Sequence, residues 1–213
     1  CVDNTFMSPF FQNPLDFGID VVLHSTTKYI NGHSDVIGGC LVTSDEKIAE
    51  RFKFLQNSIG SVPSPFDCWL ILRSTKTLAQ RMKAHNENAI SICKALSENK
   101  KIEKLYYPGL ESHPQYDLAK SQMSGFGGII SLDVGSYEKA VNFCNALKIF
   151  QIAESLGGVE SLVCHPVSMT HGSVPVDLRN EFGLTVGLVR LSVGIEDTDD
   201  LLEDIDNALK SLN

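Results

Sequence analysis

The sequence predicts an α/β fold, because short β-favouring runs alternate with longer helical patterns along its 213 residues. Apolar runs at residues 21–23, 39–43 and 188–193 have the length and composition of strands. Apolar residues recur at helical spacing over residues 66–98 and 197–212. A chain of this length can bury a substantial core, as one large domain or two small ones.

Three strands and one capped helix are expected near the N-terminus. Residues 1–2 resemble the end of a buried strand, and further strands are expected at 20–23 and 39–43. The first two should be neighbours in a sheet, because only a short crossover separates them. Asp45 is a suitable N-cap for a helix over residues 46–57, with Glu46 in its first turn.

The long helical pattern over residues 66–98 is interrupted at 73–75, which we interpret as a domain boundary. Residues 1–75 would form one domain and residues 76–213 the other. In the second domain, strands and helices alternate, which favours a small α/β sandwich. Its strands are expected at 102–107, 128–134 and 188–193, and its helices at 115–120, 137–147 and 197–212.

The stretch from Val21 to Val36 contains the most chemically suggestive residues. An apolar run leads into Ser25 and Thr27, two residues apart, with the Lys28 amine beside them. Hydroxyls can donate hydrogen bonds to a phosphate, and a lysine in a partly dry pocket can attack a carbonyl as a neutral amine. This combination suits pyridoxal phosphate, although surface loops often contain the bare pattern Ser-x-Thr-Lys.

The composition excludes several classes of function. A formal charge of −8 argues against nucleic acid as a partner, since nucleic-acid binding needs a basic face. No apolar run approaches the length of a membrane span, so no membrane partner is expected. The six cysteines form no Cys-x-x-Cys pair and fit reduced thiols of a cytoplasmic protein.

The histidines do not predict a metal site. His165 and His171 have a spacing that matches no common zinc pattern, and we interpret both as structural. His85 lies on an apolar helical stripe and is expected to be a core or hinge residue. No metal is therefore predicted.

Several motifs resemble one known family in order and spacing over essentially the whole chain. They include Asp3-Asn4-Thr5-Phe6-Met7-Ser8-Pro9, Ser25-Thr26-Thr27-Lys28-Tyr29, Asn31-Gly32-His33-Ser34-Asp35-Val36, Glu154-Ser155-Leu156-Gly157-Gly158 and Arg190-Leu191-Ser192-Val193-Gly194. The sequence is similar to the cystathionine γ-lyase and γ-synthase family, the pyridoxal-phosphate enzymes of cysteine and methionine metabolism. The resemblance implies that the first part of the chain is the C-terminal portion of a mixed-sheet domain that binds pyridoxal phosphate. The smaller α/β sandwich would follow it.

The resemblance also implies roles for single residues. Lys28 would bind the cofactor through its amine and act as general base and acid at the substrate Cα. Asp3 would pair with the pyridine nitrogen, and Ser25 and Thr27 would hold the phosphate. From the sequence alone, Asp3 reads more simply as an acidic residue in a turn.

Three further residues are implied to face the substrate. Arg190 interrupts an apolar strand, and the resemblance implies that it binds the α-carboxylate; a solvent-exposed strand face is the alternative. Ser155 would line the substrate site near the lysine. Glu154 would meet the distal ammonium of cystathionine, with a helix cap or an exposed acid as the alternatives.

The chain lacks an initiator methionine and opens within a strand, so we expect it to be a piece of a longer protein. The resemblance implies a glycine-containing phosphate loop and a ring-stacking tyrosine upstream of Cys1. An upstream segment would pair beside the Cys1–Val2 strand, and a homotetramer would add residues from a neighbouring subunit.

The expected activity is a lyase of transsulfuration that converts cystathionine to cysteine, 2-oxobutyrate and ammonia. Met7 and residues 63–70 favour the lyase over two alternatives, cystathionine γ-synthase and methionine γ-lyase. An alternative from another class is an inactive fragment that serves only in assembly.

Overall fold

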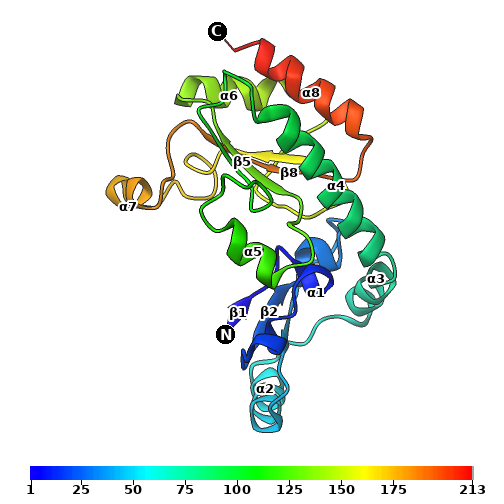
Figure 1. Ribbon diagram of the computed structural model, residues 1–213. Coiled ribbons are helices and arrows are strands. Elements are labelled where there is room, and N and C mark those ends of the chain that lie inside the picture. The colour runs from blue at the N-terminus through cyan, green and yellow to red at the C-terminus, as the bar shows by residue number, and fades with distance from the viewer. Residues whose placement is uncertain (213) are drawn as a thin grey trace.

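The computed structural model describes residues 1–212, apart from the side chain of Asn180, and is built around two β-sheets (Figure 1). One sheet has three strands in the order β1-β2-β3, and the other has five in the order β4-β5-β8-β7-β6. Helices cover or connect both sheets, which confirms the α/β class. The proposed division into residues 1–75 and 76–213 stays a prediction, and Asn213 lies outside the described residues.

The first sheet carries the lysine stretch. Its strands are β1 (Val2–Asp3), β2 (Val22–Ser25) and β3 (Gly39–Val42). β1 pairs in parallel with β2, as expected for neighbouring strands, and β3 pairs antiparallel with β2. The prediction for β2 was wrong by two residues at each end, because main-chain pairing continues through polar side chains to Ser25.

The connections around β2 are more helical than expected. A short helix, α1 (Ser8–Phe11), and a 3₁₀ turn (Pro14–Phe17) lie where the sequence indicated only a turn. Both have proline in their first two positions, where a missing N–H costs no hydrogen bond. After β2, residues Thr26–Ile30 form a helical turn that is kinked at Lys28, which has non-helical angles (φ −91°, ψ −132°). We call this segment the lysine turn.

Three helices follow the first sheet: α2 (Glu46–Ile59), α3 (Pro65–Thr75) and α4 (Leu78–Leu96). Asp45 caps α2 as expected, its carboxylate accepting a 2.9 Å hydrogen bond from the Ile48 N–H. The break between α3 and α4 falls at residues 76–77, just after the expected interruption. α2 buries none of its residues, although one of its faces is apolar.

The second half has two layers, which confirms the predicted α/β sandwich. Its strands are β4 (Lys104–Tyr106), β5 (Ile129–Asp133), β6 (Gln151–Ile152), β7 (Leu162–Cys164) and β8 (Leu188–Ser192). Helices α4, α6 (Tyr137–Ala146) and α8 (Thr198–Lys210) share one apolar core with this sheet. Helices α5 (Tyr116–Gln122) and α7 (Val176–Glu181) complete the fold, and α7 projects from it (Figure 1).

Three elements of the second half were missed: β6, β7 and α7. β6 and β7 have two and three residues, too few for an alternating pattern to be recognised. All three β7 residues are buried, so even its short run shows no polar face. α7 has only six residues. Among residues 1–212, no helix combines the length and apolar character that crossing a bilayer requires.

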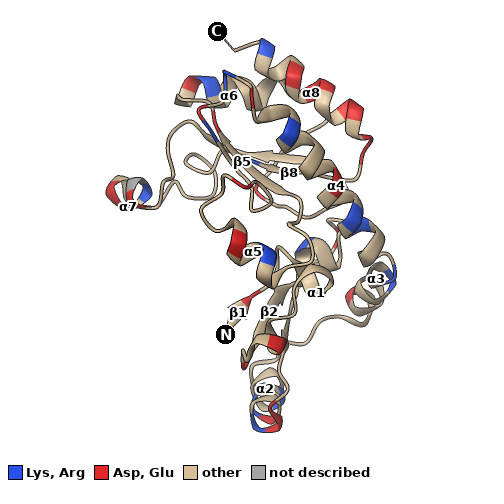
Figure 2. Cartoon of the chain, viewed as in Figure 1, with Lys and Arg blue, Asp and Glu red and all other residues tan. Residues whose placement is uncertain are grey.

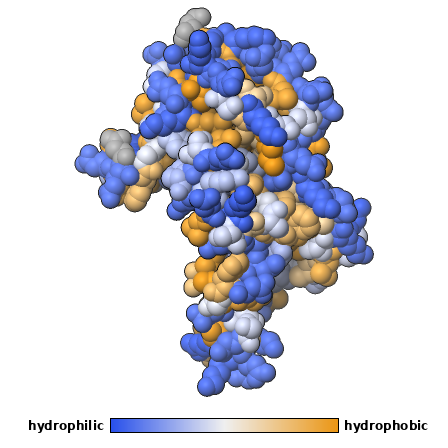
Figure 3. Space-filling view, viewed as in Figure 1, coloured by the Kyte–Doolittle hydropathy of each residue, from blue (hydrophilic) through white to orange (hydrophobic). Residues whose placement is uncertain are grey.

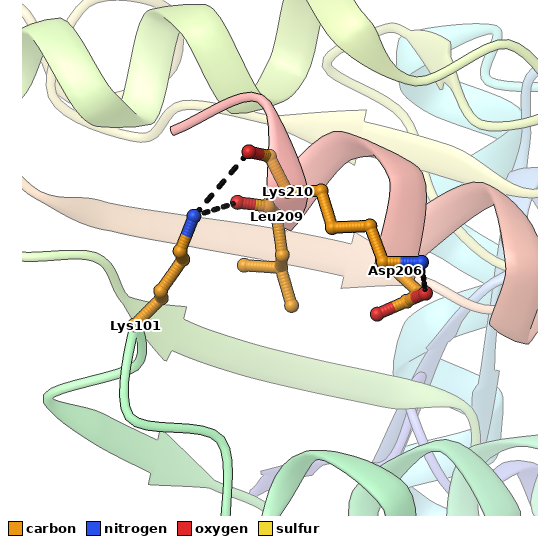
Figure 4. A network of polar contacts seen from close by, with 4 residues as sticks. All are labelled: Lys101, Asp206, Leu209 and Lys210. Atoms are coloured by element: carbon orange, nitrogen blue, oxygen red, sulfur yellow. Dashed lines mark hydrogen bonds and ion pairs between the residues drawn. The ribbon is translucent and has the colours of Figure 1, made fainter. Parts of the chain in front are cut away.

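Helix α8 is strongly acidic (Figure 2). Two sets of hydrogen bonds anchor it to the rest of the fold. At its end, the Lys101 ammonium donates hydrogen bonds to the Leu209 and Lys210 carbonyls, at 3.0 and 3.3 Å (Figure 4). Near its middle, the buried Asp204 carboxylate accepts hydrogen bonds from three successive N–H groups, those of residues 148, 149 and 150, at 2.8, 2.8 and 3.3 Å. Asp206 only pairs with Lys210, on the exposed face at 2.5 Å.

Asp204→Ala is expected to lower the free energy of unfolding by about 3 kcal/mol, because three successive N–H groups lose their buried carboxylate acceptor. Asp206→Ala, on the same helix, should change it by less than about 0.5 kcal/mol, since exposed ion pairs contribute little. Urea unfolding of both variants measures the difference. Equal losses would contradict this account of α8.

Candidate functional site

The site centres on the Lys28 amine, which projects from the lysine turn at the end of β2. Its Nζ donates a 3.0 Å hydrogen bond to the Ser155 hydroxyl, 127 residues away in the loop that follows β6. Lys28 and Ser155 are both half-buried. The fold therefore brings together two of the residues that the sequence singled out.

Arg190 joins this pair from β8. Val189 and Leu191 lie in the core beneath the helices, so strand alternation directs Arg190 to the opposite face, as expected. One guanidinium nitrogen, Nη2, donates to the main-chain carbonyls of Glu154 and Ser155, at 2.8 and 3.0 Å. The buried Nε has no hydrogen-bond partner within residues 1–212. Arg190 thus orients the Ser155 loop through Nη2, while its Nε–H remains unpaired among these residues.

The surroundings of Lys28 favour its neutral form. Burial lowers the pKa of the Lys28 amine below its ordinary value, because a charged ammonium loses hydration. The positive charge of Arg190 lowers this pKa further. A larger fraction of Lys28 is therefore the nucleophilic, basic amine at neutral pH than for a solvated lysine.

A second group of polar residues lies at the carboxyl ends of β1 and β2. Asp3 Oδ1 accepts hydrogen bonds from the Thr5 N–H and hydroxyl, at 3.0 and 2.6 Å. The Thr5 hydroxyl oxygen in turn accepts a 2.8 Å bond from the Ser25 N–H. Thr5 therefore links Asp3 to Ser25, a bridging role that sequence reasoning did not assign to it.

The hydroxyls of the lysine stretch differ in what they contact. Thr27 exchanges hydrogen bonds with Gly38, donating to its carbonyl at 3.2 Å and accepting from its N–H at 3.0 Å. The Thr26 hydroxyl is buried without a partner in the described chain. The half-buried Ser25 side chain also makes no hydrogen bond to the residues that the structure describes. The hydroxyls of Ser25 and Thr26 are thus unpaired within the described chain, whereas the Thr27 hydroxyl already bonds Gly38.

Glu154 lies in an exposed bend next to Ser155 and not in a helix, which makes the helix-cap alternative wrong. Its main-chain carbonyl binds Arg190, whereas its carboxylate makes no hydrogen bond or ion pair among residues 1–212. The Glu154 side chain is thus exposed and unpaired within the described residues.

Arg81 and Gly157 support the lysine turn, and the sequence interpretation missed both. Gly157 has φ +77°, and a Cβ there would come within 2.9 Å of the Tyr29 nitrogen, so its loop packs directly on the turn. Arg81 is 4% exposed and donates to the Tyr29 carbonyl at 2.6 Å. Arg81 lies between Leu78 and His85 on the apolar face of the helical pattern, and this position could have indicated a buried arginine.

The histidines occupy structural positions. His85 is fully buried, and its Nδ1 lies 2.7 Å from the Val193 carbonyl. Burial lowers its pKa to about 4. His165 bonds Ser168 and the Val186 carbonyl. Within the described residues, no three His, Cys, Asp or Glu side chains are placed to hold a metal ion.

Comparisons with known proteins agree with this arrangement. The model of one family, described as Cys/Met metabolism PLP-dependent enzyme, matches residues 1–210. A cystathionine gamma-lyase of Dictyostelium discoideum is 56% identical over 98% of this chain and 54% of its own length. A cystathionine beta-lyase of Lactococcus lactis subsp. cremoris is 52% identical over 98% of this chain and 55% of its own.

Among solved structures, a cystathionine gamma synthase of Xanthomonas oryzae pv. oryzae in complex with cystathionine superposes with a TM-score of 0.95. It is 48% identical and is matched over 98% of this chain and 54% of its own. The chain thus spans about half the length of the relatives that it matches.

Arg190→Met is expected to raise the pKa of Lys28 toward its ordinary value, because it removes a neighbouring positive charge while burial persists. Arg190→Lys keeps that charge and should leave the Lys28 pKa nearer that of the wild type. The measurement is the rate at which an amine-selective reagent labels Lys28 in cofactor-free protein, followed by mass spectrometry as a function of pH. Identical pH profiles for the wild type and Arg190→Met would contradict the electrostatic role.

Proposed function

The chain belongs to the family of Cys/Met metabolism PLP-dependent enzymes, and we propose that it serves a carbon–sulfur lyase that acts on cystathionine by γ-elimination. The products, after uptake of water, would be cysteine, 2-oxobutyrate and ammonia. The observation that carries the proposal is the half-buried Lys28 amine, held by Ser155 and lying near Arg190. A neutral amine beside an arginine suits chemistry at the Cα of an amino acid.

The residues present fit pyridoxal phosphate. Lys28 would hold the cofactor through its amine, and the Ser25 hydroxyl would donate to its phosphate. The Thr27 hydroxyl would join it by turning its O–H from the Gly38 carbonyl to the phosphate. The half-buried Ser25 hydroxyl, which makes no hydrogen bond to the described residues, is one group that such an anion would satisfy. The Asp3 carboxylate, held at one oxygen by Thr5, would keep the ring nitrogen protonated.

Pyridoxal phosphate, when bound, supplies an electron sink that stabilises negative charge developing at the substrate Cα. The chain's own residues then determine where protons move. Lys28 would take the Cα proton and return it later, and its lowered pKa leaves more of the amine unprotonated and able to accept a proton at neutral pH. Ser155 holds the amine in place through the 3.0 Å hydrogen bond.

Arg190 and Glu154 would select the substrate. The Nε of Arg190, unpaired among the described residues, would donate to the α-carboxylate. The contact would become bidentate when Nη2 exchanges one of its two carbonyl acceptors for the second carboxylate oxygen. The free Glu154 carboxylate would pair with the distal ammonium that cystathionine carries. Cystathionine would thus be recognised at both of its amino-acid ends.

A second candidate is the γ-replacement reaction, in which cysteine joins an activated homoserine. Solved gamma synthase structures of Xanthomonas oryzae pv. oryzae, which superpose with TM-scores of 0.95, support it. Methionine γ-lyase activity, which would use Lys28 and Arg190 in the same way but not Glu154, is the third candidate. A role in assembly alone, without catalysis, is the alternative from another class.

We also propose that further polypeptide covers part of this surface. β1 and β3 are both edges of their sheet. A groove of about 940 Å³ separates α2 from β2 and β3, and apolar side chains line much of it. Apolar surface is visible in this half of the molecule (Figure 3), and Ile59, at the end of α2, is 72% exposed. An upstream segment pairing beside β1, and the contacts of a cytoplasmic homotetramer, would bury such surface.

Lys28→Ala is expected to abolish turnover of cystathionine, because one amine both anchors the cofactor and moves the Cα proton. The fold should persist, since Lys28 makes a single side-chain hydrogen bond. The test compares 2-oxobutyrate formation and borohydride-trapped cofactor in the wild type and the variant. A wild-type protein that is colourless and traps no cofactor would favour the assembly role.

Glu154→Ala should reduce kcat/KM for cystathionine by about tenfold or more, as expected when a carboxylate that pairs with an ammonium is lost. Turnover of methionine or homocysteine should change little, because neither has a distal ammonium. Glu160→Ala, on the same loop, is the control. Equal losses for all three substrates would remove Glu154 from substrate recognition.

A further inference from the structure

Arg81 is a buried cation with no acidic partner. Its guanidinium makes four hydrogen bonds, all to neutral oxygens, and no ion pair among residues 1–212 involves it. The acceptors are the Tyr29 carbonyl at 2.6 Å, the Ile30 carbonyl at 3.2 Å, the Ser74 carbonyl at 3.1 Å and the Thr77 hydroxyl at 3.1 Å. Burying a charge in this way is costly and needs well-placed acceptors.

Two of the acceptors belong to the lysine turn, directly after Lys28. The turn ends without continuing into a longer helix, so its last carbonyls lack the usual helical donors. The Asn31 and Gly32 N–H groups satisfy the carbonyls of Thr26 and Lys28, at 3.0 and 2.7 Å. Tyr29 is fully buried, so water cannot reach its carbonyl, and Arg81 supplies the donor.

The sequence makes room for this contact. Gly32 has φ +68°, and a Cβ at this position would collide with the Arg81 guanidinium. The Gly32 carbonyl also accepts a 2.9 Å bond from the Val159 N–H, which ties the same segment to the Ser155 loop. The guanidinium contacts the lysine turn, the end of α3 and the start of α4. A lysine ammonium, with three donors on one atom, cannot span these acceptors.

We propose that Arg81 is a positioning residue, which fixes the lysine turn and thereby aims the Lys28 amine at Ser155 and the reacting carbon. The part of this proposal that concerns catalysis rests on the proposed function. The part that concerns the turn rests on the hydrogen bonds alone. Arg81 itself touches neither Lys28 nor Ser155 through its side chain, so it acts only through the main chain of residues 29 and 30.

The test uses the full-length protein with Arg81→Ala and Arg81→Lys, and Lys83→Ala as the control on the exposed side of α4. Hydrogen exchange, followed by mass spectrometry on the cofactor-free protein, reports the N–H groups of Asn31 and Gly32. We expect Arg81→Ala to exchange these about tenfold faster or more, with Arg81→Lys intermediate and Lys83→Ala unchanged. Guanidinium at millimolar concentration should refill the cavity and restore protection, whereas urea should not.

Steady-state kinetics provides the second arm. Misplacing a catalytic group by about 1 Å costs on the order of 10²-fold in rate, so kcat should fall in Arg81→Ala with little change in KM, and guanidinium should recover part of it. Faster exchange over the whole protein, with no rescue by guanidinium, would make Arg81 merely a stability residue and overturn the proposal. Unchanged exchange in the turn would also overturn it. If the wild type shows no lyase activity, the proposed function fails, and the exchange arm still decides the role of Arg81.

Discussion

The site depends on how a buried turn satisfies its own main chain. Lys28 projects from the lysine turn, which follows β2, is kinked at Lys28 and is largely buried. The carbonyls of such a turn are cut off from water, and an unpaired buried carbonyl costs free energy comparable to a lost hydrogen bond. Arg81 removes that cost for two carbonyls at once. The stabilised turn is then a fixed base on which the amine can be aimed.

The same logic operates on the other side of the amine. The Ser155 loop has no regular structure, and Arg190 holds it by its carbonyls while Gly157 packs against Tyr29. Arg190 is itself held by β8, whose neighbouring residues Val189 and Leu191 are fully buried in the sandwich core. The packing of β8 therefore fixes Arg190, which fixes the Ser155 loop and so the Lys28–Ser155 hydrogen bond. Two arginines that have no carboxylate partner within residues 1–212 thus orient the two loops that meet at the site.

The two halves of the chain meet in a small apolar cluster under the lysine turn. Met7 and Phe11 come from the first connection, Met82 from α4 and Leu156 from the Ser155 loop, and all belong to one cluster with Tyr29. The site therefore lies where separate segments converge, which is common for ligand sites. The cluster includes Tyr29, the residue that follows Lys28 in the chain. A substitution that changes packing in the cluster would therefore shift Lys28 through Tyr29.

The sequence by itself determined most of the longer elements and several individual positions. Apolar alternation placed Arg190 opposite the core residues of β8, Asp45 marked the start of α2, and the run before Ser25 marked the strand that presents Lys28. These are local consequences of the periods of strands and helices. Only the tertiary structure decided the partners: Ser155 for Lys28, Thr5 as the bridge from Asp3 to Ser25, and Arg81 for the lysine turn. Such contacts join residues up to 127 positions apart, and they depend on how layers pack, which no local pattern encodes.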